Sequence, residues 1–278
     1  ANLEGVNELS TDDSYVFEKG DIRDSAKITS LLQSFAPDSV MHLAAESHVD
    51  RSIDDGSTFI SSNVVGTQVL LDCALSYWRQ LNLEKQEKFR FLHVSTDEVY
   101  GALGRHGQFS ENSPYSPNSP YAASKAASNH LVRAWHQTYG LPVLTTNCSN
   151  NYGPKQHEEK LIPTIIRKAL AGEAIPIYGD GKNIRDWLYV KDHAIAIDLV
   201  FHKGINSQTY NIGGLKSIKV GDFLKVLINL SNSKILTQLD PKLMRPADVT
   251  LQIPNTNKFN KITHFKTQYN FEESVKHL

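Results

Sequence analysis

The sequence predicts an α/β protein built on a doubly wound, mostly parallel sheet, with a smaller α/β lobe towards the C-terminus. Along the 278-residue chain, apolar runs of strand length alternate with longer stretches whose apolar residues recur at intervals of three and four. Hydrophobic residues make up 40% of the chain and charged residues 21%, which is ordinary for a folded protein. This composition excludes disordered, collagen-like and low-complexity proteins.

The first 150 residues supply the regular part of this pattern. Strands are expected at 39–44, 89–95 and 143–147, and helices at 25–35, 58–78 and 121–139. The polar stretch 104–120 contains three prolines and is expected to form a loop. The last of these prolines, Pro120, suits the first turn of the helix that follows.

Beyond residue 150 the pattern is less regular. Short strands are expected at 175–178, 187–190 and 209–212, with helices at 162–171, 192–202 and 220–230. No internal repeat and no linker separates the two parts of the sequence. We therefore expect the second lobe to be intermixed with the first.

Charge and cysteine content exclude several partners. The formal net charge of −1 gives no global attraction to nucleic acid or to anionic membranes. No apolar run approaches the ~20 residues that a membrane-spanning helix needs, and no signal peptide opens the sequence. Cys73 and Cys148 are too few for a disulfide framework or a cysteine-rich zinc site. A reducing, cytoplasmic setting is expected.

The segment from Tyr121 to Lys125 carries the first candidate chemistry. On a helix, residues four apart share a face, so the Tyr121 phenol and the Lys125 ammonium are expected to converge. A neighbouring cation favours the phenolate, which lowers the tyrosine pKa and makes it a usable base near neutral pH. A surface Tyr and Lys one turn apart is the common alternative.

The second candidate follows a hydrophobic strand directly, at Thr96, Asp97 and Glu98. Ligands of open α/β sheets bind outside the carboxyl ends of the strands. Two adjacent carboxylates there can divide acid and base work if their surroundings separate their pKa values. The alternative is that Asp97 caps a helix and Glu98 is solvated.

The third candidate is the segment 43–51, LAAESHVDR, again at a strand end. Its small residues allow a planar cofactor to approach the backbone closely. His42, His48 and Asp50 suggest a metal site, but no further ligands stand at useful spacing. A core histidine satisfied by its neighbours is the preferred interpretation, and no metal is expected.

Taken together, the three strand ends resemble the extended short-chain dehydrogenase/reductase family of nucleotide-sugar enzymes. The motifs most similar to the dTDP-glucose 4,6-dehydratase family are STDEVYG, LAAESHVDRS, SPYAASKAASNHLVRAW, NCSNNYGP and IRDWLYVKDHA. The resemblance implies a Rossmann-like fold, NAD as cofactor and a hydro-lyase activity. It also implies an NAD-binding domain at 1–150, a mainly nucleotide-sugar-binding lobe at 151–278 with segments that return to the core, and a homodimer formed through helices 58–78 and 121–139.

The resemblance further implies a role for each catalytic residue. Tyr121 takes the proton of the sugar 4-hydroxyl as C4 gives hydride to NAD, and Lys125 lowers the pKa of Tyr121 and binds the nicotinamide ribose. Thr96 hydrogen-bonds the sugar O4. Glu98 removes the C5 proton and Asp97 protonates the departing 6-hydroxyl, after which hydride returns to C6. The related epimerases commonly lack this Asp-Glu pair, which favours a dehydratase.

The same resemblance gives two sets of binding residues. Cofactor contacts are expected from Asp21, Ile22, Leu43, Ala44, Ala45, Ser47, Ser62, Tyr121, Lys125 and Asn151. Substrate contacts are expected from Ser47, Thr96, Asn150, Lys160, Leu161, Pro176, Ile177, Tyr178, Arg185 and Arg245. Lys160 and Arg185 also suit the substrate on charge alone, because a nucleoside diphosphate needs cationic partners.

Two departures from the family pattern stand out. The glycine-rich fingerprint and first βα unit are absent, so the sequence is expected to be N-terminally truncated, with a gap in the sheet unless another segment fills it. Residues 1–278 on their own are then expected not to bind NAD and to be largely insoluble or molten, and their activity is open. The second departure lies in the C-terminal lobe. The segment Met244-Arg245-Pro246-Ala247-Asp248 is more similar to the corresponding segment of GDP-mannose dehydratases. In the same lobe, Val220 stands where a nucleotide-binding Asn is expected.

These departures leave alternatives open. A GDP-mannose 4,6-dehydratase or another nucleotide-sugar epimerase on the same fold is one alternative. A non-catalytic subunit that binds nucleotide sugars is the other.

Overall fold

The computed structural model describes residues 6, 12, 14–178, 181–214, 217–231, 237–240 and 249–278; for 176–178, 228–231 and 237–240 it describes the backbone alone. The order of elements begins with α1 (Ser25–Phe35), β1 (Ser39–His42), α2 (Val49–Asp54), α3 (Gly56–Phe59), a π-helical turn η3 (Ile60–Val65), α4 (Gly66–Gln80), α5 (Leu83–Lys88), β2 (Arg90–Thr96), a 3₁₀ turn η4 (Asp97–Tyr100), α6 (Pro120–Tyr139), β3 (Val143–Cys148) and β4 (Asn150–Tyr152). It continues with α7 (Leu161–Leu170), β5 (Ile175–Tyr178), β6 (Ile184–Tyr189), α8 (Val190–Lys203), β7 (Thr209–Ile212), β8 (Ser217–Lys219), α9 (Val220–Ser231), β9 (Thr237–Asp240), β10 (Leu251–Gln252), α10 (Asn257–Thr263) and α11 (Phe271–Val275).

The central sheet is parallel and has the strand order β1-β2-β3-β7. Its middle strands are buried on both sides, as crossover helices require. On β2, Phe91 belongs to the core beneath α1, α4 and α6, while the next residue, Leu92, belongs to the core beneath α8 and α10. The expected doubly wound, mostly parallel α/β architecture is confirmed.

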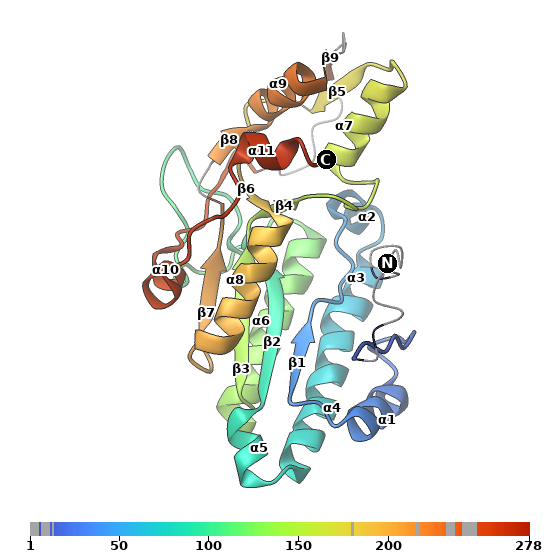
Figure 1. The fold of residues 1–278 in the computed structure, drawn as a ribbon, viewed down its shortest axis with the longest axis vertical. Coiled ribbons are helices and arrows are strands. Elements are labelled where there is room, and N and C mark those ends of the chain that lie inside the picture. The colour runs from blue at the N-terminus through green and yellow to red at the C-terminus, as the bar shows by residue number, and fades with distance from the viewer. Residues whose placement is uncertain are drawn as a thin grey trace.

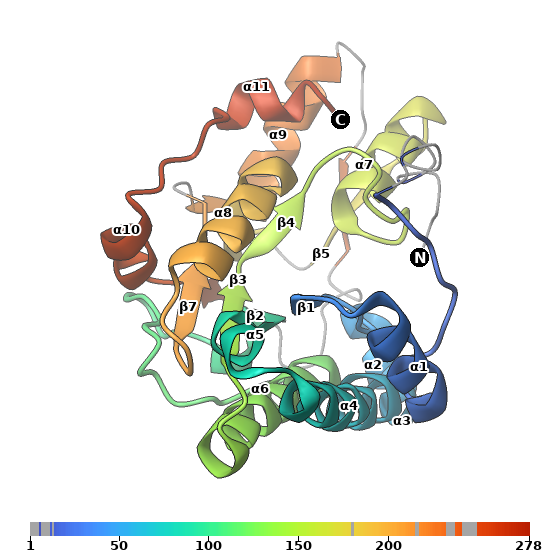
Figure 2. The same ribbon diagram turned by 60° about the horizontal axis from the view of Figure 1, so that its bottom comes forward.

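Helices cover both faces of this sheet (Figures 1 and 2). α4 and α6 pack together on one face with α1 beside α4, and α8 lies on the opposite face, where it contacts α10. β1 forms one edge of the sheet, and among the described residues it pairs with β2 alone. Met41 and Leu43, on and just after β1, are exposed.

The second lobe lies beyond the carboxyl ends of the central strands (Figure 1). It contains the sheet β10-β6-β4, with β8 antiparallel to β6, and the parallel pair β5-β9. Its core is strongly aromatic, with Trp187 stacked on Phe223 at a centroid distance of 4.6 Å. β7 and α8 come from the later part of the chain but pack on the central sheet.

Most expected elements occur within two or three residues of their predicted bounds. The main difference is the helix expected at 58–78, which consists of α3, the π turn η3 and α4. In addition, the strand expected to end at Ala44 ends at His42, and Val190 begins α8 instead of closing a strand. The sequence pattern did not predict the short elements α2, α5, β4, β8, β9, β10 and α10.

Within the described residues, the stretch Gly56–Gln80 is long and apolar enough, by length and composition alone, to cross a membrane. This differs from the sequence expectation, which considered only uninterrupted apolar runs. Half of its most apolar window is buried inside the protein, against neighbours that include α1 and α6. We therefore interpret it as a core helix of the α/β domain.

Candidate active site

A cavity of about 410 Å³ lies outside the carboxyl ends of β2 and β3, between the central sheet and the second lobe. This is the position at which open α/β sheets bind their ligands. Its lining residues are Ser47, His48, Val49, Ser95, Thr96, Glu98, Tyr121, Cys148, Ser149, Asn150, Asn151, Gln156, Glu159, Lys160, Leu161, Ile162, Gly181, Asn183, Arg185, Trp187 and Val220.

The end of β2 turns sharply beneath this cavity. Thr96 caps the 3₁₀ turn, because its hydroxyl accepts the backbone N–H of Glu98 at 3.2 Å. Gly101 ends the turn with a φ of +83°, and a Cβ there would lie 2.1 Å from the Ser116 carbonyl oxygen. The turn therefore needs glycine at that position, and it brings Thr96 and Glu98 to the cavity wall.

Asp97 lies directly behind these two residues and is 1% exposed. Burial raises the pKa of Asp97 well above its usual value, and the Glu98 and Asp186 carboxylates add to the effect. Burial thus favours the protonated form of Asp97. The alternative in which Asp97 caps the helix is wrong, because Thr96 makes the cap.

Helix α6 carries Tyr121 and Lys125. Ser119 caps its N-terminus by accepting the Ala122 N–H at 3.1 Å, with Pro120 in the first turn as expected. Tyr121 is 9% exposed and Lys125 is 4% exposed, so the alternative of an exposed surface pair is wrong. The Lys125 ammonium donates to the Val94 carbonyl oxygen at 2.8 Å.

The electrostatics of this pair differ from the sequence expectation. Burial raises the pKa of Tyr121 well above its usual value, and the nearby Glu98 carboxylate raises it further. Burial also lowers the pKa of Lys125 to about 8. The net pKa of Tyr121 is thus raised, and not lowered as the sequence predicts, because desolvation and the carboxylate charges dominate.

Asn63, in the π turn η3, connects α6 to the loop after β1. Its side-chain amide accepts from the Glu46 N–H at 2.8 Å and donates to the Glu46 carbonyl oxygen at 2.9 Å and to the Ser124 hydroxyl at 2.8 Å. Its backbone carbonyl oxygen accepts hydroxyl hydrogen bonds from Thr67 and Ser128. This buried network fixes the helix turn between Tyr121 and Lys125.

Two buried histidines with their rings in tilted contact lie beneath the same region. His42 and His93 are buried with ring centroids 5.0 Å apart, and Nε2 of His42 lies 2.9 Å from the Thr67 hydroxyl. Burial lowers the pKa of His42 to about 3 and that of His93 well below 6.5, so both rings are neutral. The interpretation of His42 as a satisfied core histidine is confirmed. The described residues contain no group of three His, Cys, Asp or Glu side chains able to hold a metal.

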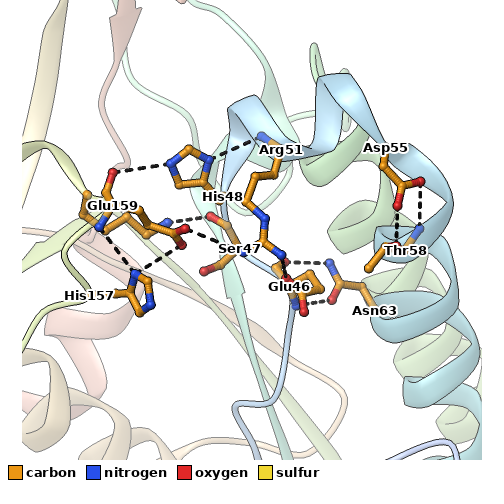
Figure 3. Close-up of polar contacts among 10 residues, drawn as sticks. Glu46, Ser47, His48, Arg51, Asp55, Thr58, Asn63, His157 and Glu159 are labelled. Carbon is orange, nitrogen blue, oxygen red and sulfur yellow. Dashed lines mark hydrogen bonds and ion pairs between the residues drawn. The ribbon is translucent and has the colours of Figure 1, made fainter. Parts of the chain in front are cut away.

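At the cavity rim, the segment 46–51 meets the segment 157–160 (Figure 3). Arg51 forms ion pairs with Glu46 at 3.4 Å and with Glu159 at 3.6 Å. His48 caps α2 and its Nε2 lies 3.4 Å from the Glu159 carbonyl oxygen. The Lys160 ammonium donates to the Ser47 carbonyl oxygen at 2.6 Å, so the two lobes are joined across the cavity mouth.

The chain as a whole matches one protein family. The family model described as GDP-mannose 4,6 dehydratase matches residues 1–278, the entire sequence. The chain belongs to this dehydratase family.

Its similar relatives are named more narrowly. A dTDP-glucose 4,6-dehydratase of Xanthomonas campestris is 60% identical over 213 residues, which are 77% of this chain and 61% of the relative. A dTDP-glucose 4,6-dehydratase of Shigella flexneri is 45% identical over 99% of this chain and 80% of the relative. The chain thus spans about 61% of the length of the Xanthomonas relative that it matches.

Solved structures agree with this family. The crystal structure of a double mutant of DesIV, a dTDP-glucose 4,6-dehydratase of Streptomyces venezuelae with NAD and DAU bound, aligns with a TM-score of 0.90 at 37% identity, over 99% of this chain and 82% of that one. The UDP-glucose 4-epimerase of Thermotoga maritima aligns with a TM-score of 0.88 at 25% identity, over 99% and 85%. Dehydratases and epimerases of nucleotide sugars thus share this architecture.

The dehydratase fold brings together many of the residues expected from the sequence. Those in the cavity lining are Ser47, Thr96, Glu98, Tyr121, Asn150, Asn151, Lys160, Leu161 and Arg185. Asp97 and Lys125 are buried nearby. Val220, expected as a departure at the nucleotide site, also lines the cavity.

Other expected residues lie elsewhere. Asp21 is exposed and paired with Arg23, and Ile22 lies against Gly66 of α4. Leu43, Ala44 and Ala45 are exposed after the end of β1, and Ser62 lies in the π turn. None of these six lines the described cavity. The side chains of Pro176, Ile177 and Tyr178, the whole of Arg245 and the segment 244–248 lie outside the described residues.

Sequence analysis missed several residues of this site. Gln156, Glu159 and Asn183 line the cavity, and Gln252 contacts Asp97 from β10. Glu159 stands next to Lys160, and Asn183 stands two residues before Arg185, so proximity to expected residues was a usable signal. Gln252 had no such signal, because it lies 155 residues from Asp97 along the chain.

Proposed function

We propose that this protein catalyses the NAD-dependent dehydration of dTDP-glucose to the 4-keto-6-deoxy sugar. The observation that carries this proposal is the meeting of Thr96, Glu98 and Tyr121 at one cavity, with the buried Asp97, whose pKa is raised, between Thr96 and Glu98 in the same turn. The names of the curated relatives support dTDP-glucose as the substrate. Because the chain spans only part of its first relatives, the activity is proposed for the protein at its full native length.

Tyr121 and Thr96 are assigned to the sugar 4-hydroxyl. The Tyr121 phenolate accepts the 4-hydroxyl proton and becomes the phenol, and a hydrogen bond between Thr96 and Tyr121 stabilises the phenolate in part. Lys125 is held at Val94 by one of its three N–H groups, which leaves donors for ribose hydroxyls. Helix α6 packs against β2, and this contact holds Tyr121 and Lys125 at fixed positions relative to Thr96.

The two carboxyl groups are assigned to the loss of water. The 4-keto group acidifies the C5–H bond, so Glu98 takes that proton as the C5=C6 double bond forms. The C6–O bond breaks with its electron pair on oxygen, and Asp97 gives its proton to that oxygen, so that water leaves. The raised pKa of Asp97 supports this division of roles, because it favours the protonated form that a general acid needs.

The residues present fit NAD at its nicotinamide end. Ser95 Oγ and Asn151 Oδ1 are buried, belong to residues of the cavity lining and have no hydrogen-bond partner among the described residues. Such atoms suit the hydroxyl and amide groups of a nicotinamide riboside. The chemistry that bound NAD supplies is hydride acceptance from C4 and hydride return to C6. We propose that the remaining residues expected from the sequence also contact the cofactor or the substrate. We further propose that residues 1–150 form the cofactor domain and that residues 151–278 mainly form the lobe that binds the sugar nucleotide.

A panel of nucleotide sugars tests the activity. Incubation of the native protein with dTDP-glucose, GDP-mannose and UDP-glucose should yield a 4-keto-6-deoxy product from dTDP-glucose. Turnover of GDP-mannose in its place would favour the second dehydratase class, and epimer formation would favour an epimerase. A double variant, Asp97→Asn with Glu98→Gln, should stall after C4 oxidation, with bound NADH and a 4-keto hexose. Product at the native rate from this variant would remove the pair from the mechanism.

We also propose that the protein is a cytoplasmic homodimer. Both cysteines, Cys73 and Cys148, are free, as expected in a reducing compartment. α4 and α6 lie side by side on one face of the central sheet, where two such pairs from two subunits can form a four-helix interface. Sedimentation at micromolar concentration should give the mass of a dimer, and a monomer would contradict the proposal.

A further inference from the structure

The buried carboxyl group of Asp97 has a specific neighbour on a distant part of the chain. The side-chain amide of Gln252 donates to Asp97 Oδ1 at 2.6 Å. Both side chains are buried, with 1% of Asp97 and 2% of Gln252 exposed. At this depth a hydrogen bond to a carboxyl group is not shared with bulk water, so its donor strongly influences how the carboxyl group is oriented.

Gln252 is held firmly in place. Together with Leu251 it forms the two-residue strand β10, which pairs in parallel with β6, where Gln252 lies opposite Arg185. The loop that follows the Asp97 turn closes over the same segment, because the Leu103 N–H donates to the Leu251 carbonyl oxygen at 3.0 Å and the Phe109 N–H donates to the Ile253 carbonyl oxygen at 2.9 Å. The donor is therefore fixed from two sides before any ligand binds.

We propose that Gln252 is a positioning residue, which occupies Asp97 Oδ1 so that Oδ2 carries the proton that is delivered to the departing 6-hydroxyl. An amide N–H can only donate, so it pairs with the carboxyl oxygen that bears no proton. The second oxygen is then the O–H donor. The inference rests on the proposed dehydration and adds to it the group that selects which oxygen of Asp97 is the acid.

The charges around Asp97 set the expected pH effect. Glu98 on the same turn and Asp186 on β6 raise its pKa, while Arg185 on β6 and the Gln252 amide lower it; burial is the largest cause. Tyr121 on α6 and Cys148 on β3 also face Asp97 and are uncharged at neutral pH, because their own pKa values are raised. Removing the amide thus moves the titration of Asp97 to higher pH.

Gln252→Met tests the proposal, because methionine has a similar length and volume but no donor. Burst measurements with dTDP-glucose separate C4 oxidation, followed by NADH absorbance, from water loss, followed by product formation. We expect oxidation and KM within about twofold of native and water loss slower by about tenfold or more, a fraction of what a general acid contributes. The limb of the pH profile that requires protonated Asp97 should move to higher pH, and Gln252→His, which retains an N–H donor, should restore part of the rate.

Asn255→Ala is the matched control. Asn255 lies three residues further along and its amide donates to Gln108 Oε1 at 3.0 Å, so the variant loosens the same segment without touching Asp97. If Gln252→Met does not fold, Gln252→Asn replaces it, because it keeps an amide but withdraws the donor by one methylene. The proposal would be overturned if Gln252→Met slowed C4 oxidation and water loss equally, or if it left the pH profile unchanged. It would also be overturned if Asn255→Ala stalled at the same step. Absence of 4-keto-6-deoxy product from the native protein would instead overturn the proposed function.

Discussion

The floor and the rim of the cavity are built in opposite ways. The floor, formed by Thr96, Asp97, Tyr121 and Lys125, is buried and is held by hydrogen bonds to neutral partners. The rim, formed by Glu46, Arg51, His157 and Glu159, is partly exposed; Arg51 forms ion pairs with both glutamates, and His157 Nδ1 lies 3.6 Å from the Glu159 carboxylate (Figure 3). Arg51, at the centre of the rim, has 55% of its side chain exposed.

This difference assigns the two regions different tasks. In the floor, removal from water shifts pKa values and fixes side-chain positions, which is what proton transfer needs. At the rim, exposed ion pairs each stabilise by only about 0–1 kcal/mol and weaken in salt, so the ion pairs of Arg51 can break and re-form at small cost. Floor substitutions should therefore affect chemistry and folding strongly, and rim substitutions weakly.

The largest expected effect is that of Tyr121→Phe. Loss of the phenol should lower kcat by about 10³-fold, within the range of general acid–base catalysis, and leave sugar-nucleotide binding intact. Steady-state kinetics and calorimetric titration measure the two effects. Tyr139→Phe, at the exposed end of the same helix, is the control and should retain native activity. Near-native turnover of Tyr121→Phe would remove Tyr121 from the mechanism.

Asn63→Ala tests whether the floor depends on its buried network. The variant leaves the Glu46 N–H and carbonyl oxygen without their partner, so the free energy of unfolding should fall by about 3 kcal/mol. Urea unfolding measures this loss. Asn82→Ala removes the exposed cap of α5 and should cost about 1 kcal/mol. Equal losses in the two variants would mean that the buried network adds nothing beyond a surface cap.

The buried histidines should make stability depend on pH. His42 has a pKa of about 3 when folded and 6.5 when unfolded, so the unfolded chain binds its proton first as the pH falls. The associated stability is complete above pH 6.5 and is lost towards pH 3, by about 2 kcal/mol between pH 6.5 and 5. His42→Gln should remove this part of the slope in denaturant melts. An unchanged slope in His42→Gln would show that His42 is charged or solvated in the fold.

The smallest expected effect is that of Arg51→Ala at the rim. It should lower stability by less than about 1 kcal/mol, and the difference from native should shrink further in 1 M salt. Thermal melts at two salt concentrations measure it. A loss of stability above about 2 kcal/mol that persists in high salt would show that the rim, like the floor, is held by contacts shielded from water.

Sequence patterns predicted the parts of the site that are local. The strand before Thr96 and the helix of Tyr121 and Lys125 are each specified by adjacent residues, so their side chains fell where expected. Contacts between distant segments were not predictable, and Gln252 is the clearest case because a two-residue strand carries no periodic signal. The pKa of Tyr121 was predicted in the wrong direction, since burial and the approach of Glu98 depend on tertiary packing rather than on the spacing to Lys125.

The π-helical turn Ile60–Val65 has a consequence for the length of the chain. A π turn closes i→i+5 hydrogen bonds and so holds about one residue more than the same stretch of α-helix; removing one residue would let it become α-helical and leave Phe59 near its present orientation relative to Gly66, whereas adding one would rotate Phe59 by about 100°. Phe59 presents its ring edge-on to Tyr121 at 6.3 Å, so an insertion would take away one wall of Tyr121 without altering any residue in contact with it. Exposed positions such as Ile60 and Val65 can accept other side chains, whereas a further insertion between Phe59 and Gly66 should not be tolerated.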